Sequence, residues 1–292
     1  MNIKSELQGV KGLLNKLRDS HMPSGNIIAH EAIKKLGYTA SRITKDEVRN
    51  GFNTLLFNAL IEEWKVFQKY EKEFYKSKII PSIFELIEKR KKEFPICQSL
   101  IKNIKTAIVK KNRIKDSEWL IAFLSKSLFE YYEALFQSLH QSRRSRAGGS
   151  FQYQIENLFN LAGFPFAKQT RLNGPVDFLL PSENYFSQYR HDAIILSVKR
   201  TLRERWQQAI AELQAARVGR IYLATAEIDK NKIRERDLDR MDSLNVTLVV
   251  FDNIKMEKFQ KRNTVIGYSE FINTNVLSAE SLWIRRGVSS LR

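Results

Sequence analysis

Ser197–Trp206 has the sequence SVKRTLRERW and joins the end of an apolar run to the start of a charged segment. The run before it, Ala193–Val198, has the length and composition of a buried strand. Lys199 follows directly, so the strand is expected to carry this lysine to an edge of a sheet. A helix is expected from Leu202 onward. This stretch therefore predicts a strand, a short turn and a helix, which is the repeating unit of an α/β fold.

The same alternation continues through the second half of the chain, where short apolar runs are bounded by turn residues. Strands are expected at Val176–Leu180, Ala193–Val198, Arg220–Ala224 and Val246–Phe251, with helices at Leu202–Ala216 and Ile228–Met241. Strands that alternate with helices predict an α/β domain with a mixed central sheet flanked by helices.

The first half of the chain is expected to be helical. Thr44–Glu47 has the pattern of a capping box and opens a long apolar-periodic stretch through Phe67. Further helices are expected at Ile83–Lys92 and at Ser117–Gln141, whose wide apolar stripe suits a core or a dimer contact. The basic, glycine-bearing segment Arg143–Ser150 is expected to be a joint, followed by a helix that ends at Gly163.

These features predict two regions. Residues 1–142 form a helical N-terminal region for DNA contact or dimerisation, and residues 143–292 form a catalytic and recognition domain. The division follows the change from helical patterning to alternating strands and helices.

Charge and cysteine content narrow the class of protein. The chain has 49 Lys and Arg against 32 Asp and Glu, a formal charge of +17, which favours a polyanionic partner, although a solvated basic surface has the same balance. Cys97 is the single cysteine, which excludes an intrachain disulfide and fits a reducing cytoplasm. No apolar run is long enough to span a bilayer. The four histidines lack ligand spacing and are assigned no chemistry.

Asp177, Lys199 and Glu212 supply the groups needed to hydrolyse a phosphodiester, which are carboxylates for a divalent metal and a lysine near the nucleophile. In the common nuclease arrangement a second acid lies two residues before the lysine, where this chain has Ser197. Glu212 lies about three turns along the expected helix and is the replacement. Taken singly, each residue has a simpler explanation, namely a turn cap, a solvated lysine and an ion pair with an arginine.

Arg203, Glu204 and Arg205 begin the same expected helix. Arginine donates two hydrogen bonds to guanine and glutamate accepts one from cytosine, so the run matches neighbouring G·C pairs in the major groove. The alternative is a charge cluster in the first turn of a helix, with weak local salt bridges. Its position four residues after the candidate lysine favours DNA recognition.

Together these residues resemble the CCGG family of type II restriction endonucleases, a branch of the PD-(D/E)XK nucleases in which the second acid has moved to a helix. The resemblance covers about residues 143–251 and rests on Asp177, Ser-x-Lys at Lys199, Arg203–Trp206 and Glu212. It implies a restriction-endonuclease-like fold, Mg²⁺ bound by Asp177 and Glu212, catalytic assistance by Lys199, and contacts of Arg203, Glu204 and Arg205 with a CC/GG half-site.

The resemblance also implies partners and a site. The partners are double-stranded DNA, a second copy of the chain as a homodimer, and a cognate DNA methyltransferase that acts on the same site in the cell. The expected site is palindromic, with a CC/GG core interrupted by a central base pair, and extra flanking bases as in TCCNGGA are one form of it.

A further acid and an aromatic side chain follow from the family pattern. The family has Arg-x-Gly-x-Ser-Phe-Glu before the sheet, whereas this chain has Gln152 at the last position, so Glu156 becomes the candidate catalytic acid. Some relatives extrude the central bases and stack them on an aromatic ring. Trp64 is the candidate for that role, and the alternative is a tryptophan buried against neighbouring helices.

Two other functions are consistent with part of the pattern. A structure-directed repair or recombination nuclease has the same metal chemistry but no need of a run matched to G·C pairs. A non-catalytic DNA-binding regulator has no need of Asp177, Lys199 and Glu212. A restriction endonuclease accounts for both sets of residues.

Overall fold

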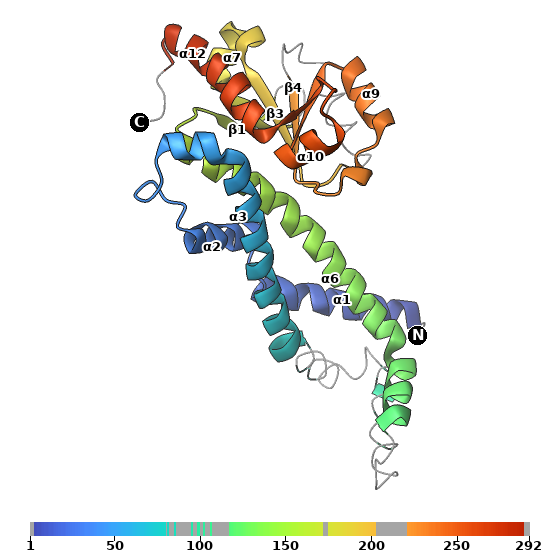
Figure 1. The fold of residues 1–292 in the computed structure, drawn as a ribbon. Coiled ribbons are helices and arrows are strands. Elements are labelled where there is room, and N and C mark those ends of the chain that lie inside the picture. Colours follow the sequence, from blue (N-terminus) through green and yellow to red (C-terminus); the bar gives the residue numbers. More distant parts are fainter. Residues whose placement is uncertain are drawn as a thin grey trace. The chain divides into compact units, whose positions relative to one another are not determined.

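The computed structural model describes residues 3–79, 117–171, 175–202 and 221–288, together with a few isolated residues between 80 and 116. It divides into two compact units, one made of Met1–Ser24 with Val66–Arg146 and the other of Gly25–Lys65 with Ala147–Arg292. The long helices α3 (Lys45–Phe74) and α6 (Ser117–Ala162) supply residues to both units (Figure 1). The roles predicted for residues 1–142 and 143–292 stay predictions. The helices expected at Ile83–Lys92 and Leu202–Ala216 lie largely outside the described residues.

The first unit is helical. It contains α1 (Ile3–His21), the end of α3, the π-helical turn η1 (Tyr75–Ile79) and most of α6. Arg143 donates two hydrogen bonds to Glu71, at 2.7 and 2.6 Å, and this contact raises the pKa of Arg143. Arg146 Nε donates to the carbonyl of Pro23 at 3.0 Å, and burial lowers the pKa of Arg146. Arg143 and Arg146 of the basic segment thus have internal partners.

The segment Arg143–Ser150, expected to be a joint, is an uninterrupted helical part of α6, although the boundary between the two units falls within it, between Arg146 and Ala147. Gly148 and Gly149 each cost a helix about 1 kcal/mol relative to alanine. The contacts of Arg143 and Arg146 lie on the turns just before them. Tertiary contacts of this kind outweigh the local preference for a break. The end predicted at Gly163 is confirmed, since α6 stops at Ala162 and Gly163 has a φ of +73°.

The second unit is built on a mixed six-stranded sheet with strand order β1-β2-β3-β4-β5-β6. The strands are β1 (Ala167–Arg171), β2 (Pro175–Leu180), β3 (Ile194–Lys199), β4 (Ile221–Thr225), β5 (Val246–Val250) and β6 (Val265–Gly267). β1, β2 and β3 pair antiparallel, and β3 to β6 pair parallel. The predicted α/β class with a mixed sheet is confirmed, whereas the polar β1 and the three-residue β6 were missed.

Helices complete the second unit. They are α2 (Gly25–Leu36), α7 (Glu183–Gln188), η2 (Arg190–Asp192), η3 (Lys230–Lys232), α9 (Glu235–Ser243), α10 (Asp252–Lys258), α11 (Tyr268–Glu270), η4 (Phe271–Val276) and α12 (Leu277–Arg285). The helix expected from Ile228 begins only at Glu235. Asp229 accepts a hydrogen bond from the backbone N–H of Asn231, and this local turn sets a short 3₁₀ helix before it.

The capping box of α3 is confirmed. Thr44 N–H donates to Glu47 Oε2 at 2.7 Å and Glu47 N–H donates to Thr44 Oγ1 at 3.3 Å, the two reciprocal bonds of this motif. The bonds from Thr44 lower the pKa of Glu47. Among the described helices, none combines the length and the hydropathy that a membrane span requires.

The core of the second unit lies between the sheet and the parts of α3 and α6 that belong to it. Phe159 of α6 is fully buried, with ring centroids 5.6 to 5.9 Å from four other phenylalanines, Phe52, Phe164, Phe166 and Phe178. Phe178 comes from β2, so this aromatic cluster holds the helices against one face of the sheet. Asp177, which directly precedes Phe178 on β2, projects from the other face of the sheet.

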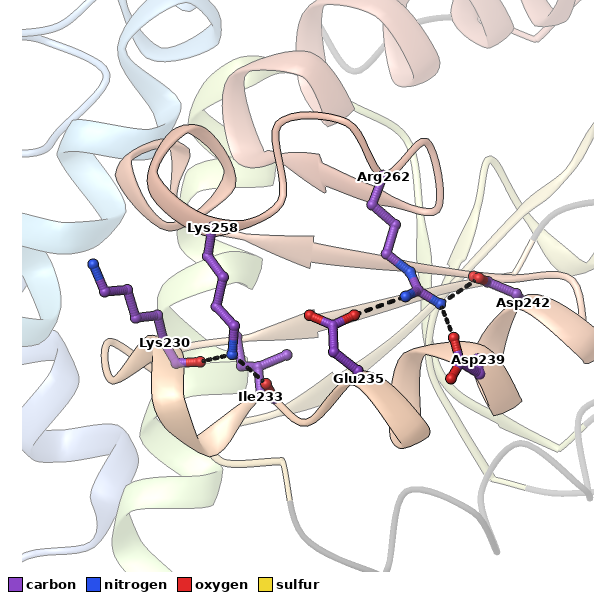
Figure 2. Close-up of polar contacts among 7 residues, drawn as sticks. All are labelled: Lys230, Ile233, Glu235, Asp239, Asp242, Lys258 and Arg262. Carbon is purple, nitrogen blue, oxygen red and sulfur yellow. Dashed lines mark hydrogen bonds and ion pairs between the residues drawn. The ribbon is translucent and has the colours of Figure 1, made fainter.

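Charged contacts fix α9 and η3 to α10 and to the loop that joins α10 to β6. Figure 2 shows Arg262 between three carboxylates, Glu235, Asp239 and Asp242, at 2.8, 2.7 and 2.5 Å, and the hydrogen bonds to the last two raise the pKa of Arg262. Lys258 donates to the carbonyls of Lys230 and Ile233. These contacts stabilise the sheet edge that β4, β5 and β6 form.

Candidate active site

Asp177 and Lys199 meet because β2 and β3 pair antiparallel in a defined register. Phe178 is paired with Leu196, which places Asp177 opposite Ser197. Ser197 and Lys199 are two residues apart on β3 and therefore project from the same face. The start of β2 and the end of β3 thus bring an acid, a hydroxyl and a lysine to one corner of the sheet.

The carboxylate of Asp177 is the centre of this corner. Its Oδ2 accepts hydrogen bonds from Val198 N–H at 2.7 Å, Ser197 Oγ at 3.2 Å and Lys199 Nζ at 3.3 Å. The side chains of Asp177 and Lys199 are 23% and 34% exposed, so the pair is half-buried and open to a ligand from solvent. Ser197 occupies the position where related nuclease patterns have an acid, and here it donates to Asp177 instead of offering a second carboxylate.

The chemistry of this corner suits a divalent metal only with a second acid. Oxygen ligands from carboxylates are those that Mg²⁺ prefers, and Asp177 offers Oδ1, which none of its three contacts uses. Among the described residues no group of three or more His, Cys, Asp or Glu could hold a metal. Glu212, the expected second ligand, and Arg203, Glu204 and Arg205, the expected DNA readers, lie outside the described residues.

Glu156 is engaged elsewhere. It lies on α6, and its carboxylate forms an ion pair with Lys168 of β1 at 2.7 Å. Lys168 is paired with Phe178, so by the alternation of strand residues it projects from the face opposite to Asp177. Within the described part of the chain, no contact brings Glu156 and Asp177 together.

Trp64 lies on α3 with 43% of its surface exposed. The alternative of a tryptophan buried against neighbouring helices was therefore wrong. Its neighbour Glu63 is only 5% exposed, so this turn of α3 directs one side chain inward and the next one outward.

The structure contains a polar cluster beside Lys199 that was not predicted from the sequence. Arg200 Nη1 donates to Glu63 Oε1 at 2.8 Å, and Ser150 Oγ donates to the same oxygen at 2.7 Å. Glu63 and Arg200 are 137 residues apart, and no spacing pattern links positions at that separation. The one local signal was that Arg200 directly follows the candidate lysine.

Sequence comparisons link the chain to a known family. The family model described as EcoRII C terminal matches residues 111–272. The type II restriction enzyme SsoII of Shigella sonnei is 24% identical over 277 residues, which cover 90% of this chain and 80% of that protein.

Two solved structures of restriction endonucleases have a similar fold. Metal-depleted Ecl18kI in complex with uncleaved DNA is 25% identical with a TM-score of 0.72, covering 97% of this chain and 87% of the other. The complex of the restriction endonuclease PspGI with substrate DNA, 17% identical with a TM-score of 0.56, covers 89% of this chain and 94% of the other and shares the fold.

Proposed function

Since the chain belongs to the EcoRII C-terminal family and is a type II restriction enzyme, we propose that it cleaves double-stranded DNA at a palindromic site with a CC/GG core. The core is interrupted by a central base pair, and flanking bases as in TCCNGGA extend it. The observation that carries the proposal is the contact of Lys199 with Asp177 at 3.3 Å, at the corner of the sheet where β2 begins and β3 ends.

Each residue assigned to phosphodiester hydrolysis has a distinct role. Asp177, together with Glu212, would hold Mg²⁺, which when bound would supply Lewis-acid stabilisation of the phosphate and lower the pKa of its water ligand. Lys199 is held beside Asp177 and places its positive charge where negative charge develops on the phosphate. Val198 N–H and Ser197 Oγ orient the Asp177 carboxylate. Glu156 remains a further candidate acid, and its carboxylate forms an ion pair with Lys168.

DNA recognition is assigned to the segment that follows β3. Arg203, Glu204 and Arg205 read the G·C pairs of one half-site, and a homodimer presents two such segments to the two halves of a palindrome. The charge of +17 favours DNA as a partner and predicts strongly salt-dependent binding. A cognate methyltransferase protects the same site in the cell.

Arg203→Ala is expected to weaken discrimination at one G·C pair of the site by about 1–3 kcal/mol, because a bidentate contact with guanine is lost. The measurement is the ratio of cleavage rates on the cognate duplex and on a duplex with that pair replaced. Lys230→Ala, which removes a cation of the exposed ion pair with Glu257, is the control and should leave the ratio unchanged. An Arg203→Ala enzyme with the wild-type ratio would exclude Arg203 from the readout.

Trp64 is proposed to stack on an extruded central base. The residue is 43% exposed, which fits an aromatic surface for a base. Stacking of the central bases would let the same CC/GG reader act on a site with an inserted pair.

Plasmid digestion tests the proposed function. Incubation with Mg²⁺ is expected to give discrete fragments whose sequenced ends share a CC/GG core, and chelation of the metal with EDTA is expected to stop cleavage. Degradation without a common end sequence, or cleavage confined to branched DNA, would indicate a structure-directed nuclease. Retardation of DNA without cleavage in Mg²⁺ would indicate a non-catalytic regulator.

A further inference from the structure

Glu63 is a buried carboxylate that joins α3 to α6 and to the chain that leaves β3. Its side chain is 6% exposed, and its Oε1 accepts hydrogen bonds from Ser150 Oγ and Arg200 Nη1. Its Oε2 is buried, with no hydrogen-bond partner in the described part of the chain. All three residues belong to the second compact unit. Arg200 is thus the cation that compensates the buried charge of Glu63.

Arg200 is held at both its side chain and its backbone. Its Nη1 donates to the carbonyl of Ala147 at 3.2 Å and to Ser150 Oγ at 3.3 Å, in addition to Glu63. Its backbone carbonyl accepts from Thr225 Oγ1, at the end of β4, at 3.4 Å. The first residue after Lys199 is therefore fixed to α3, α6 and β4.

A buried ion pair adds little to the free energy of unfolding, but it restricts where its two side chains can lie. Desolvation of both charges offsets most of their attraction, so apolar side chains of similar size stabilise a fold as well or better. Hydrogen bonds with defined directions, in contrast, allow one arrangement of the partners. The Glu63–Arg200 pair therefore contributes most by fixing where the chain lies after β3.

We propose that Glu63 is a positioning residue for cleavage, which holds Arg200 so that the adjacent Lys199 stays beside Asp177. This inference rests on the proposed function of Lys199. Trp64 directly follows Glu63 on α3, and Lys199 directly precedes Arg200. The Glu63–Arg200 ion pair therefore links the turn of α3 that carries Trp64 to the end of β3 that carries Lys199.

Glu63→Gln is the sharpest test, because the amide oxygen still accepts from Ser150 and Arg200 while the charge is lost. The single-turnover cleavage rate with Mg²⁺ is expected to fall by about 10- to 100-fold, as a misplaced catalytic group does. The Kd for the same duplex, measured without metal, is expected to stay within about threefold of wild type, because no DNA contact is removed. Glu63→Ala, which also removes the acceptor, should be slower still.

Two further variants separate position from stability. Glu62→Gln changes the neighbouring acid, whose partners are Lys35 and Lys65, and should retain the wild-type rate. The double variant Glu63→Met/Arg200→Met removes both charges of the pair together, so its melting temperature is expected to recover relative to Glu63→Ala while its cleavage stays slow. Recovery of both stability and rate would reduce the pair to a structural role and overturn the proposal.

The same assay separates this inference from the proposed function. If wild type fails to cleave the duplex, the proposed function fails first. With 2-aminopurine at the central position, wild type and Glu63→Gln should give the same change in its fluorescence on binding, and Trp64→Ala should give a different one. A Glu63→Gln enzyme with the wild-type cleavage rate overturns the positioning role. The positioning role is also overturned if Glu63→Gln binds DNA more weakly and with a smaller dependence on salt, in proportion to its loss of rate. That result would indicate that Arg200 contacts a DNA phosphate.

Discussion

Asp177→Asn and Lys199→Ala are each expected to lower the single-turnover cleavage rate by a factor of about 100 to 10,000. Asparagine keeps an oxygen that accepts from Val198 N–H and Ser197 Oγ, so the corner of the sheet should remain folded, but it lacks the charge that binds Mg²⁺ and attracts Lys199. Lys199→Ala removes the ammonium that stabilises charge on the phosphate.

Binding should survive both substitutions, because neither residue belongs to the segment assigned to base recognition. The measurement pairs cleavage rates in Mg²⁺ with specific DNA binding in its absence. Lys230→Ala is the control for the loss of one positive charge far from β3 in the sequence, and it should cleave at the wild-type rate. Normal turnover by either Asp177→Asn or Lys199→Ala would refute the assignment of the active site.

The second large effect is expected on stability. Phe159→Ala should lower the free energy of unfolding by about 3–5 kcal/mol, because a fully buried ring is removed and a cavity is left among its neighbours. Those neighbours come from α3, from the loop after α6 and from β2, namely Phe52, Phe164, Phe166 and Phe178. Urea denaturation followed by circular dichroism measures the loss.

Phe129→Ala is the matched control, since Phe129 lies on the same helix with 64% of its surface exposed. Its effect is expected to lie within about 0.5 kcal/mol of zero, as for surface substitutions in general. Equal destabilisation by the two variants would contradict the view that the aromatic cluster holds α6 against the sheet.

Local sequence patterns predicted the elements whose causes are local. Reciprocal hydrogen bonds between Thr44 and Glu47 begin α3, and Gly163 takes the positive φ that ends α6. The apolar runs became β2, β3, β4 and β5 within one or two residues of their expected bounds. In each case the structure depends on residues a few positions apart, which is the range that a periodic pattern reports.

Patterns failed where distant contacts override local preference. β1 has the polar sequence AKQTR and becomes a strand because β2 pairs with it, and β6 is too short to carry a periodic signal. Arg143–Ser150 looked like a joint because of its glycines, yet it is helical within α6, where Arg143 binds Glu71. The apolar spacing predicted a helix from Ile228, but the chain first forms a turn at Asp229 and the helix α9 begins only at Glu235.

The sequence by itself determined the α/β class, the start of α3 and the end of α6, and it supplied the candidate catalytic residues, since these follow from chain-local spacing and side-chain chemistry. Only the tertiary structure decided that Asp177 Oδ2 meets Lys199 Nζ, that Glu156 pairs with Lys168, and that Glu63 reaches Arg200. The physical reason is that these contacts depend on strand register and on helix packing across 12 to 137 residues of chain. Burial and hydrogen-bond geometry select one such arrangement, and neither is encoded in any short stretch of sequence.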